Sequence, residues 1–167
     1  MTIGVLCSGR LGLHVLRQLF KRRNVIFVCT DKESFEIKNF CLHNKVPVFV
    51  GNPRKGRAFS FLKDFKIEVL ISVNYLFLIE EDLINVPEKM AFNIHGSLLP
   101  KYRGRTPHVW AIINNEKETG ITAHKIEAGC DTGAVLEQIV VPISKTDTGA
   151  SILNKYELLY FPLIEEV

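Results

Sequence analysis

Residues 2–31, TIGVLCSGRLGLHVLRQLFKRRNVIFVCTD, decide the predicted fold of this chain. Two continuous apolar runs, at residues 3–7 and 25–29, stand on either side of an amphipathic segment at residues 11–20. That segment is followed by three cations, residues 21–23, and positive charge suits the C-terminal end of a helix dipole. A helix between two continuous apolar strands is typical of a parallel sheet that is covered on both faces.

The same alternation of apolar runs and helical segments continues through the first half of the chain. The further predicted elements are strands at residues 46–50, 69–73 and 90–94, and helices at residues 33–43, 56–65 and 80–84. We therefore predict a Rossmann-like, doubly wound α/β fold with a mostly parallel sheet. In such folds ligands bind beyond the carboxyl ends of the strands.

The second half of the chain has a different pattern. Strands are expected at residues 121–126 and 135–141, and the turn-rich segment at residues 128–133 predicts a hairpin-like return between them. Trp110 lies in a segment that we expect to form a helix packed against the sheet. A last helix is expected at residues 149–159, so the predicted fold ends in a strand hairpin and a helix.

Length and composition fit a single globular domain, residues 1–167, of a size that buries roughly 70% of its unfolded surface. A net charge of +3 is too small to indicate a broad nucleic-acid surface, so nucleic acid is not the expected partner. The N-terminus lacks the features of a signal peptide and the apolar runs are strand-sized, so we expect a cytoplasmic protein without a membrane partner. Four cysteines without CxxC spacing indicate no metal site.

The end of the sequence looks unfinished. The last predicted helix is followed by Pro162 and the acidic pair Glu165-Glu166, with no closing element. Either the domain is minimal, or a C-terminal portion is absent from this chain.

Chemistry is indicated by residues 92–107, FNIHGSLLPKYRGRTP. Asn93 and His95 are two apart on one predicted strand, so their side chains point to the same side. Asp131 lies in the turn-rich segment between the last two predicted strands. An amide, an imidazole and a carboxylate suit acyl transfer, because the first two can stabilise an oxyanion while the carboxylate tunes the imidazole. His124, on the strand that leads to Asp131, is a further histidine that can face this site.

The pattern Asn93-Ile94-His95-Gly96-Ser97-Leu98-Leu99-Pro100, with Asp131-Thr132-Gly133 downstream, closely resembles the folate-dependent formyltransferases. The resemblance runs through nearly the whole chain. It implies that N10-formyltetrahydrofolate is the formyl donor, that no metal takes part, and that Asn93, His95 and Asp131 are the catalytic residues. It also implies that the pterin pocket is lined by Tyr75, Leu76 and Phe77, by Leu98 and Pro100, and by Glu127, Ala128 and Gly129.

Within this family, residues 101–107 look most like enzymes that formylate amino sugars carried on nucleotides. Arg103 and Arg105 can pair a diphosphate bidentately. The predicted substrate-binding residues are Lys101, Arg103 and Arg105, with Ser8, Gly9 and Arg10 from the first turn. The expected partner is thus a small amine, most simply a nucleotide-linked amino sugar.

Other functions stay open at this point. Methionyl-tRNA and glycinamide ribonucleotide formyltransferases share part of the pattern. A formyltetrahydrofolate hydrolase would use the same three residues with water as the acceptor. A folate- or nucleotide-binding module without turnover is a further alternative, and a homodimer is compatible with any of them.

Overall fold

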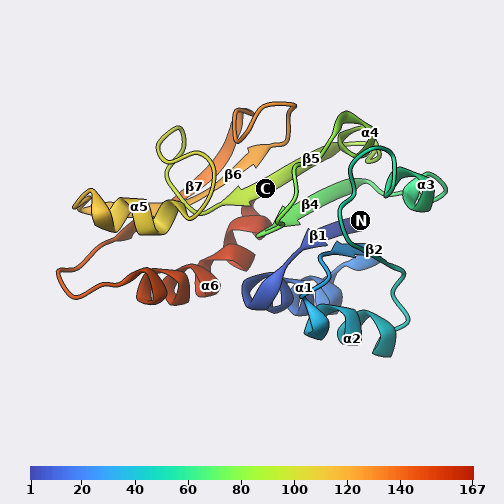
Figure 1. Ribbon diagram of the computed structural model, residues 1–167, viewed down its shortest axis with the longest axis horizontal. Helices are drawn as coiled ribbons and strands as arrows, with labels where there is room; N and C mark the ends of the chain where they lie inside the picture. The colour runs from blue at the N-terminus through green and yellow to red at the C-terminus, as the bar shows by residue number, and fades with distance from the viewer. The chain divides into compact units, whose positions relative to one another are not determined.

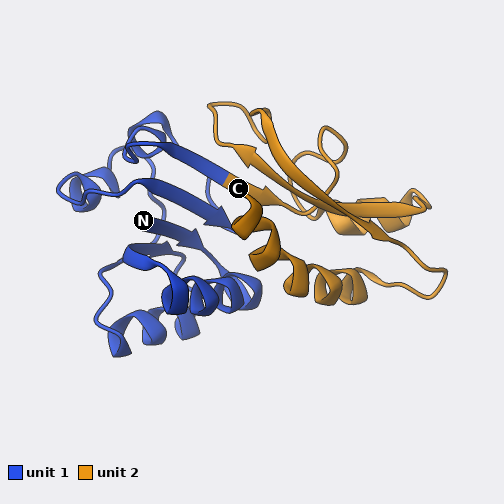
Figure 2. Ribbon diagram, turned by 180° about the vertical axis from the view of Figure 1, so that it is seen from behind, with its two compact units in different colours: residues 1–92 blue, residues 93–167 orange.

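The computed structural model describes residues 1–167, which divide into two compact units, residues 1–92 and 93–167 (Figure 2). None of the helices combines the length and the apolar character needed to cross a membrane. Each unit is built around its own strands, and the candidate catalytic residues all lie in the second unit.

Unit 1 is a parallel sheet with helices on both sides, as the alternating pattern predicts (Figure 1). Its strand order is β3-β2-β1-β4, and α1 and α2 lie on the opposite side of these strands from α3 and α4. The elements are β1 (Thr2–Cys7), α1 (Gly9–Arg22), β2 (Asn24–Thr30), α2 (Phe35–His43), β3 (Val48–Val50), α3 (Phe59–Leu62), β4 (Val69–Val73) and α4 (Glu81–Ile84).

The core of unit 1 forms where the apolar runs stack. Ile3, Val5 and Leu6 of β1 are fully buried, and each buried side chain of this size stabilises the fold by about 1.5–3 kcal/mol. Phe27 on β2 lies directly over Gly4 on β1, where a Cβ atom would approach the Phe27 ring to 2.3 Å. Glycine at position 4 is therefore required by the close approach of the aromatic ring.

Unit 2 has the predicted strand hairpin and final helix. β5 (Met90–His95) runs from the last residues of unit 1 into unit 2, where the strand order is β5-β6-β7. β6 (Glu118–Lys125) and β7 (Val135–Pro142) pair antiparallel, with Ile121 opposite Ile139. α5 (Pro107–Ile113) and α6 (Gly149–Glu166) pack against each other, and α6 also packs against β6 and β7. The mostly parallel α/β class with a C-terminal hairpin and helix is confirmed.

The last helix differs from its prediction, because α6 continues through Pro162 to Glu166 instead of ending near residue 159. Pro162 is itself exposed, while Phe161, Leu163 and Ile164 are buried. Burial of these side chains outweighs the backbone hydrogen bond that proline cannot donate. At its other end, α6 begins with a reciprocal capping box between Thr148 and Ser151.

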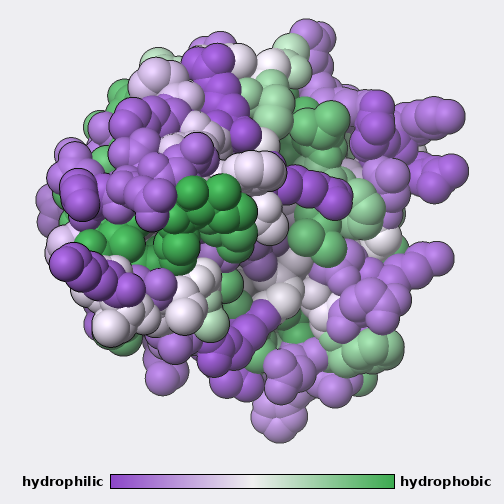
Figure 3. Space-filling model, turned by 60° about the vertical axis from the view of Figure 1, so that its left-hand side comes forward, coloured by the Kyte–Doolittle hydropathy of each residue, from purple (hydrophilic) through white to green (hydrophobic).

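Smaller differences occur at other elements. β3 and α3 are shorter than expected, and Lys55 and Gly56 have positive φ angles just before α3. The segment of Trp110 forms α5, which contacts β6 as expected, but the residues that α5 buries are Pro107 and Ala111, while Trp110 itself is 51% exposed. Figure 3 turns the left-hand side of Figure 1 towards the viewer and shows a compact hydrophobic group on that face, bordered by hydrophilic and near-neutral side chains.

Candidate active site

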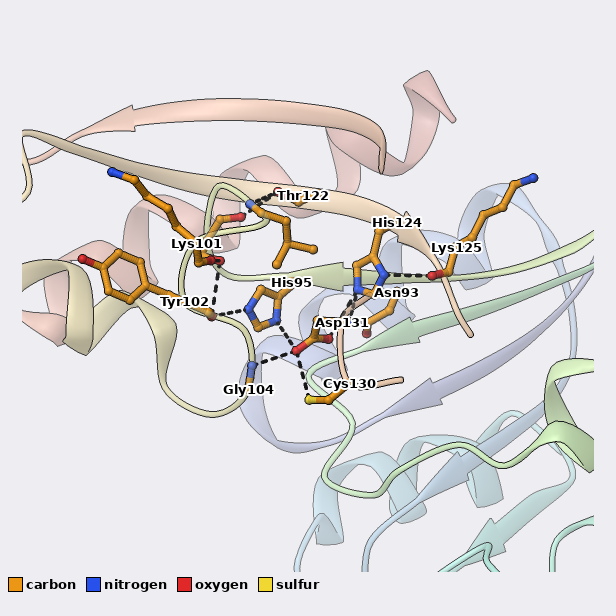
Figure 4. A network of polar contacts seen from close by, with 12 residues as sticks. Asn93, His95, Lys101, Tyr102, Gly104, Thr122, His124, Lys125, Cys130 and Asp131 are labelled. Atoms are coloured by element: carbon orange, nitrogen blue, oxygen red, sulfur yellow. Dashed lines mark hydrogen bonds and ion pairs between the residues drawn. The ribbon is translucent and has the colours of Figure 1, made fainter. Parts of the chain in front are cut away.

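The end of β5 carries two of the three predicted catalytic side chains. Asn93 and His95 are two residues apart on this strand and reach the same group of polar residues, to which Asp131 also belongs (Figure 4). His95 is buried and Asn93 is half-buried. The structure thus brings Asn93, His95 and Asp131 together within unit 2.

The tautomer of His95 follows from its neighbours. Its Nε2 lies 2.8 Å from the backbone oxygen of Tyr102, and a carbonyl can only accept a hydrogen bond, so Nε2 carries the proton. The Nδ1 atom faces Asp131 Oδ2 at 3.5 Å. Burial lowers the pKa of His95, and this outweighs the Asp131 charge and the Tyr102 hydrogen bond, which raise it. Near neutral pH the ring is therefore neutral, with the Nδ1 lone pair directed at the carboxylate side of the site.

Asp131 is the centre of the polar group. Its Oδ2 accepts the backbone N–H of Gly104 over 2.8 Å, and its Oδ1 lies 3.5 Å from Nε2 of His124. Burial would raise the pKa of Asp131, but the hydrogen bond from His124, the charge of His95 and the Gly104 amide together lower it to about 2. The carboxylate is therefore ionised at every pH at which the protein is expected to work.

His124 occupies a place that sequence reasoning did not assign to the catalytic set. It is buried on β6, its Nδ1 donates to the backbone oxygen of Lys125 over 2.9 Å, and its Nε2 lies 3.2 Å from Nδ2 of Asn93. Two histidines, His95 and His124, thus stand on either side of Asp131 (Figure 4). The signal in the sequence was its position on the strand that leads to Asp131.

The loop after β5 is fixed to the site by backbone groups. Ser97 donates its hydroxyl to the Lys101 oxygen over 2.6 Å, while Tyr102 and Gly104 supply the contacts to His95 and Asp131. Tyr102, Gly104 and Thr106 all have positive φ angles, which close this irregular loop against the end of the strand. Tyr102 and Gly104 therefore both shape this loop and supply the backbone groups that hold His95 and Asp131.

The residues predicted to bind the formyl donor lie in three segments. In unit 2, Leu98 is half-buried and Pro100, which follows a cis peptide bond, is exposed, as are Glu127, Ala128 and Gly129. In unit 1, β4 is followed by Tyr75, Leu76 and Phe77. Leu76 is 53% exposed, and the rings of Tyr75 and Phe77 meet edge to face with their centroids 5.5 Å apart. Their proposed role in donor binding stays a prediction.

The predicted acceptor residues also lie in both units. The Ser8-Gly9-Arg10 turn follows β1, next to β4 at the point where the strand order of unit 1 changes direction. Gly9 has a φ angle of +64° and donates its N–H to Ser34 Oγ over 2.9 Å, and Asn74 holds the Ser8 oxygen over 3.0 Å.

In unit 2, Arg103 and Arg105 are exposed on the loop after β5. The third cation of that loop, Lys101, has its Nζ atom 3.1 Å from Glu116 Oε1. The two arginines are therefore better placed than the lysine to meet an anion from solution.

No group of three or more His, Cys, Asp or Glu side chains is arranged to hold a metal ion. The polar group around Asp131 contains instead two imidazoles, an amide, a backbone N–H and the Cys130 thiol, which lies 3.5 Å from Asp131 Oδ2. These are groups that donate, accept and move protons at a carbonyl centre.

Comparison with known proteins shows the family of this chain. The formyl transferase family model matches residues 13–159. The polymyxin resistance protein ArnA of Wigglesworthia glossinidia brevipalpis, described as bifunctional, is 37% identical over 154 residues, which cover 88% of this chain and 24% of ArnA. The methionyl-tRNA formyltransferase of Dictyoglomus thermophilum is 32% identical over 165 residues, 92% of this chain and 53% of that enzyme. The chain thus spans about half or less of the length of these relatives.

Solved structures agree with the fold. The phosphoribosylglycinamide formyltransferase of Bacillus halodurans superposes with a TM-score of 0.85 at 24% identity, covering 98% of this chain and 91% of that one. WlaRD, a sugar 3N-formyl transferase solved in the presence of dTDP and 5-N-formyl-THF, gives a TM-score of 0.79 at 23% identity, covering 99% and 61%. The predicted formyltransferase fold is confirmed by these likenesses. By the match of the family model over most of its length, this chain belongs to the formyl transferase family.

Proposed function

We propose that this protein transfers a formyl group from N10-formyltetrahydrofolate to a primary amine, with Asn93, His95 and Asp131 as its catalytic residues. The observation that carries the proposal is the position of Asp131, whose two carboxylate oxygens lie 3.5 Å from His95 Nδ1 and 3.5 Å from His124 Nε2. Membership of the formyl transferase family supports the same reaction.

The proton chemistry follows from the tautomer of His95. In the reaction the amine nitrogen forms a bond to the formyl carbon, the bond from that carbon to the donor nitrogen breaks, and one proton passes from the amine to the departing nitrogen. His95 is neutral and its Nδ1 lone pair is open to a proton, while the Tyr102 oxygen holds the ring through Nε2. Once Nδ1 is protonated, the neighbouring Asp131 carboxylate stabilises the imidazolium.

When the amine attacks the formyl carbon, negative charge develops on the formyl oxygen, and hydrogen-bond donors are needed to stabilise it. The protonated ring of His95 and the side-chain amide of Asn93 are the donors that this chain offers at the end of β5. Nε2 of His124 lies 3.2 Å from Nδ2 of Asn93 and 3.5 Å from Oδ1 of Asp131, while its Nδ1 donates to the Lys125 oxygen. His124 therefore acts by fixing both Asn93 and Asp131.

The proposed formyl donor is N10-formyltetrahydrofolate, which supplies the activated formyl group. The residues proposed to hold it are Tyr75, Leu76 and Phe77, together with Leu98 and Pro100 and with Glu127, Ala128 and Gly129. Exposed apolar surface at Leu76 and the exposed residues 127–129 suit a flat heterocycle.

The proposed acceptor is a nucleotide-linked amino sugar. Exposed Arg103 and Arg105 lie on the loop that contacts His95 and Asp131, so an anion bound by them would lie close to the reacting amine. Guanidinium groups pair phosphate oxygens bidentately. Lys101, Ser8, Gly9 and Arg10 complete the proposed acceptor set, and Lys101 is the weakest member because it pairs with Glu116.

The test is a formyl-transfer assay with N10-formyltetrahydrofolate and three acceptors in parallel: dTDP- or UDP-linked amino sugars, glycinamide ribonucleotide and methionyl-tRNA. We expect formylation of the amino sugar. Formylation of glycinamide ribonucleotide or methionyl-tRNA instead would support formyl transfer but show that the proposed acceptor is wrong. Formate release without any acceptor would indicate a hydrolase. Donor binding without turnover under every condition would leave only a binding module.

A further inference from the structure

Thr122 of β6 has a buried hydroxyl group that contacts the loop after β5 and no reacting residue. Its side chain is fully buried, and its Oγ1 donates to the backbone oxygen of Ser97 over 2.6 Å. The same Oγ1 accepts the backbone N–H of Leu99 over 3.1 Å and a side-chain N–H of Gln138 over 2.8 Å. A hydroxyl has one hydrogen and two lone pairs, so the hydrogen-bonding capacity of Thr122 is completely used.

Gln138 of β7 adds a second link to the same loop. Its Nε2 donates to the Leu99 oxygen over 3.1 Å as well as to Thr122. Two side chains of the hairpin therefore satisfy three backbone groups of the loop, namely the Ser97 oxygen and the Leu99 N–H and oxygen. Leu99 is buried, and buried backbone groups without a hydrogen-bond partner destabilise the folded state.

Leu98 lies between Ser97 and Leu99, whose backbone groups are held by these hydrogen bonds. Its side chain lies over Gly120 of β6, where a Cβ atom would approach Leu98 Cδ2 to 2.5 Å. The backbone bonds on both sides and the packing under the side chain together leave Leu98 little freedom.

We propose that Thr122 is a positioning residue for the formyl donor: through Ser97 and Leu99 it fixes the segment Leu98–Pro100 against which the donor binds. This inference rests on the proposed function, which assigns Leu98 and Pro100 to the donor. Thr122 makes no contact with His95 or Asp131, so its effect is on donor affinity and not on proton transfer.

Ser97 provides the contrast. Its backbone oxygen belongs to the Thr122 network, but its side-chain hydroxyl donates to the Lys101 oxygen and lies 3.5 Å from the Tyr102 oxygen that holds His95. Removing the Ser97 hydroxyl should disturb the His95 branch, whereas removing the Thr122 hydroxyl should disturb the donor segment.

The experiment compares the full chain carrying Thr122→Val, Thr122→Ser or Gln138→Leu with wild type. Calorimetry with 5-formyltetrahydrofolate gives donor affinity, and steady-state kinetics gives the KM of each substrate and kcat. For Thr122→Val we expect the donor Kd and KM to rise about tenfold, the size of effect that follows from losing well-placed hydrogen bonds, while the acceptor KM changes less than about twofold. Thr122→Ser should restore donor binding, and Gln138→Leu should weaken it in the same direction.

The matched control is Thr148→Ala, which removes the N-terminal cap of α6 and so lowers the Tm without touching the loop. Unchanged donor affinity in Thr122→Val, or a loss that Thr148→Ala reproduces at equal stability, would overturn the positioning role while leaving formyl transfer intact. If the wild-type protein bound no 5-formyltetrahydrofolate, both the proposed function and the proposed role of Thr122 would be wrong. Hydrogen exchange of the Leu99 N–H gives a readout without substrate, because exchange should be faster in Thr122→Val than in Thr122→Ser.

Discussion

Gly104 donates its backbone N–H to Oδ2 of Asp131 over 2.8 Å, so a loop that begins directly after His95 holds the carboxylate opposite that histidine. Gly104 has a φ angle of +91°, a conformation that side-chain-bearing residues rarely adopt. The glycine is therefore needed for the direction of its N–H, since a Cβ atom at this position would meet no atom within 4 Å.

Gly104→Ala should destabilise the protein by about 1–2 kcal/mol, because an L-residue is strained at this φ angle. Weakening the Gly104 hydrogen bond should also raise the pKa of Asp131, measured by NMR titration of the carboxyl carbon. Gly56→Ala is the matched control, since Gly56 also has a positive φ angle and open space around it but lies in unit 1. An unchanged Asp131 titration in Gly104→Ala would show that this N–H contributes nothing to the carboxylate.

His95→Ala and Asp131→Asn should each lower turnover by at least about 100-fold, as expected for the loss of a proton-transfer group or its electrostatic partner. His124→Ala should lower turnover less, by about tenfold, because it acts through the orientation of Asn93 and Asp131. Circular dichroism and thermal melts would verify folding. Near wild-type turnover in His95→Ala with a good acceptor would exclude the proposed base.

Two groups of the candidate active site should make stability fall in acid. Burial lowers the pKa of His95 below 6.5, so its contribution is present above pH 6.5 and is lost as the pH falls towards the folded pKa. Asp131, with its pKa lowered from 3.8 to about 2, contributes about 2 kcal/mol that is present above pH 3.8 and is lost as the pH falls to about 2. Urea unfolding of wild type and Asp131→Asn between pH 7 and pH 2 measures this, and the variant should lose less stability below pH 4.

Replacing Arg103 or Arg105 by Lys should raise the KM for the nucleotide-linked acceptor by about tenfold and leave the donor KM within about twofold, because lysine cannot form the bidentate pair. Lys101→Ala is the control, since Lys101 is already paired with Glu116 and should matter less. Equal effects of all three substitutions on both substrates would argue against a diphosphate at the arginines.

Pro162→Ala should stabilise the protein by about 1–3 kcal/mol, measured as an increase in Tm. Pro162 is exposed inside α6, so alanine would add a backbone hydrogen bond without removing buried surface. A lower Tm would indicate that proline bends the helix so that Phe161 and Leu163 can be buried.

Most of the unit 1 fold could be predicted because its signal is local. The runs Ile3 to Cys7 and Val69 to Val73 are apolar along their whole length, and the structure has strands there with almost every residue buried. The extension of α6 past Pro162 could not be predicted, because the local cost of proline is visible in the sequence but the compensating burial of Phe161 and Leu163 depends on tertiary packing.

The sequence by itself determined the alternating α/β fold and the presence of Asn93, His95 and Asp131, because strand periodicity and residue type are properties of short segments. Only the tertiary structure decided how these groups are oriented. The partners that fix them are the Tyr102 oxygen, the Gly104 N–H and His124, and these come from segments up to 31 residues away along the chain. Backbone groups carry no sequence signature, so a carbonyl that selects a tautomer or an amide that holds a carboxylate is specified only when the chain has folded.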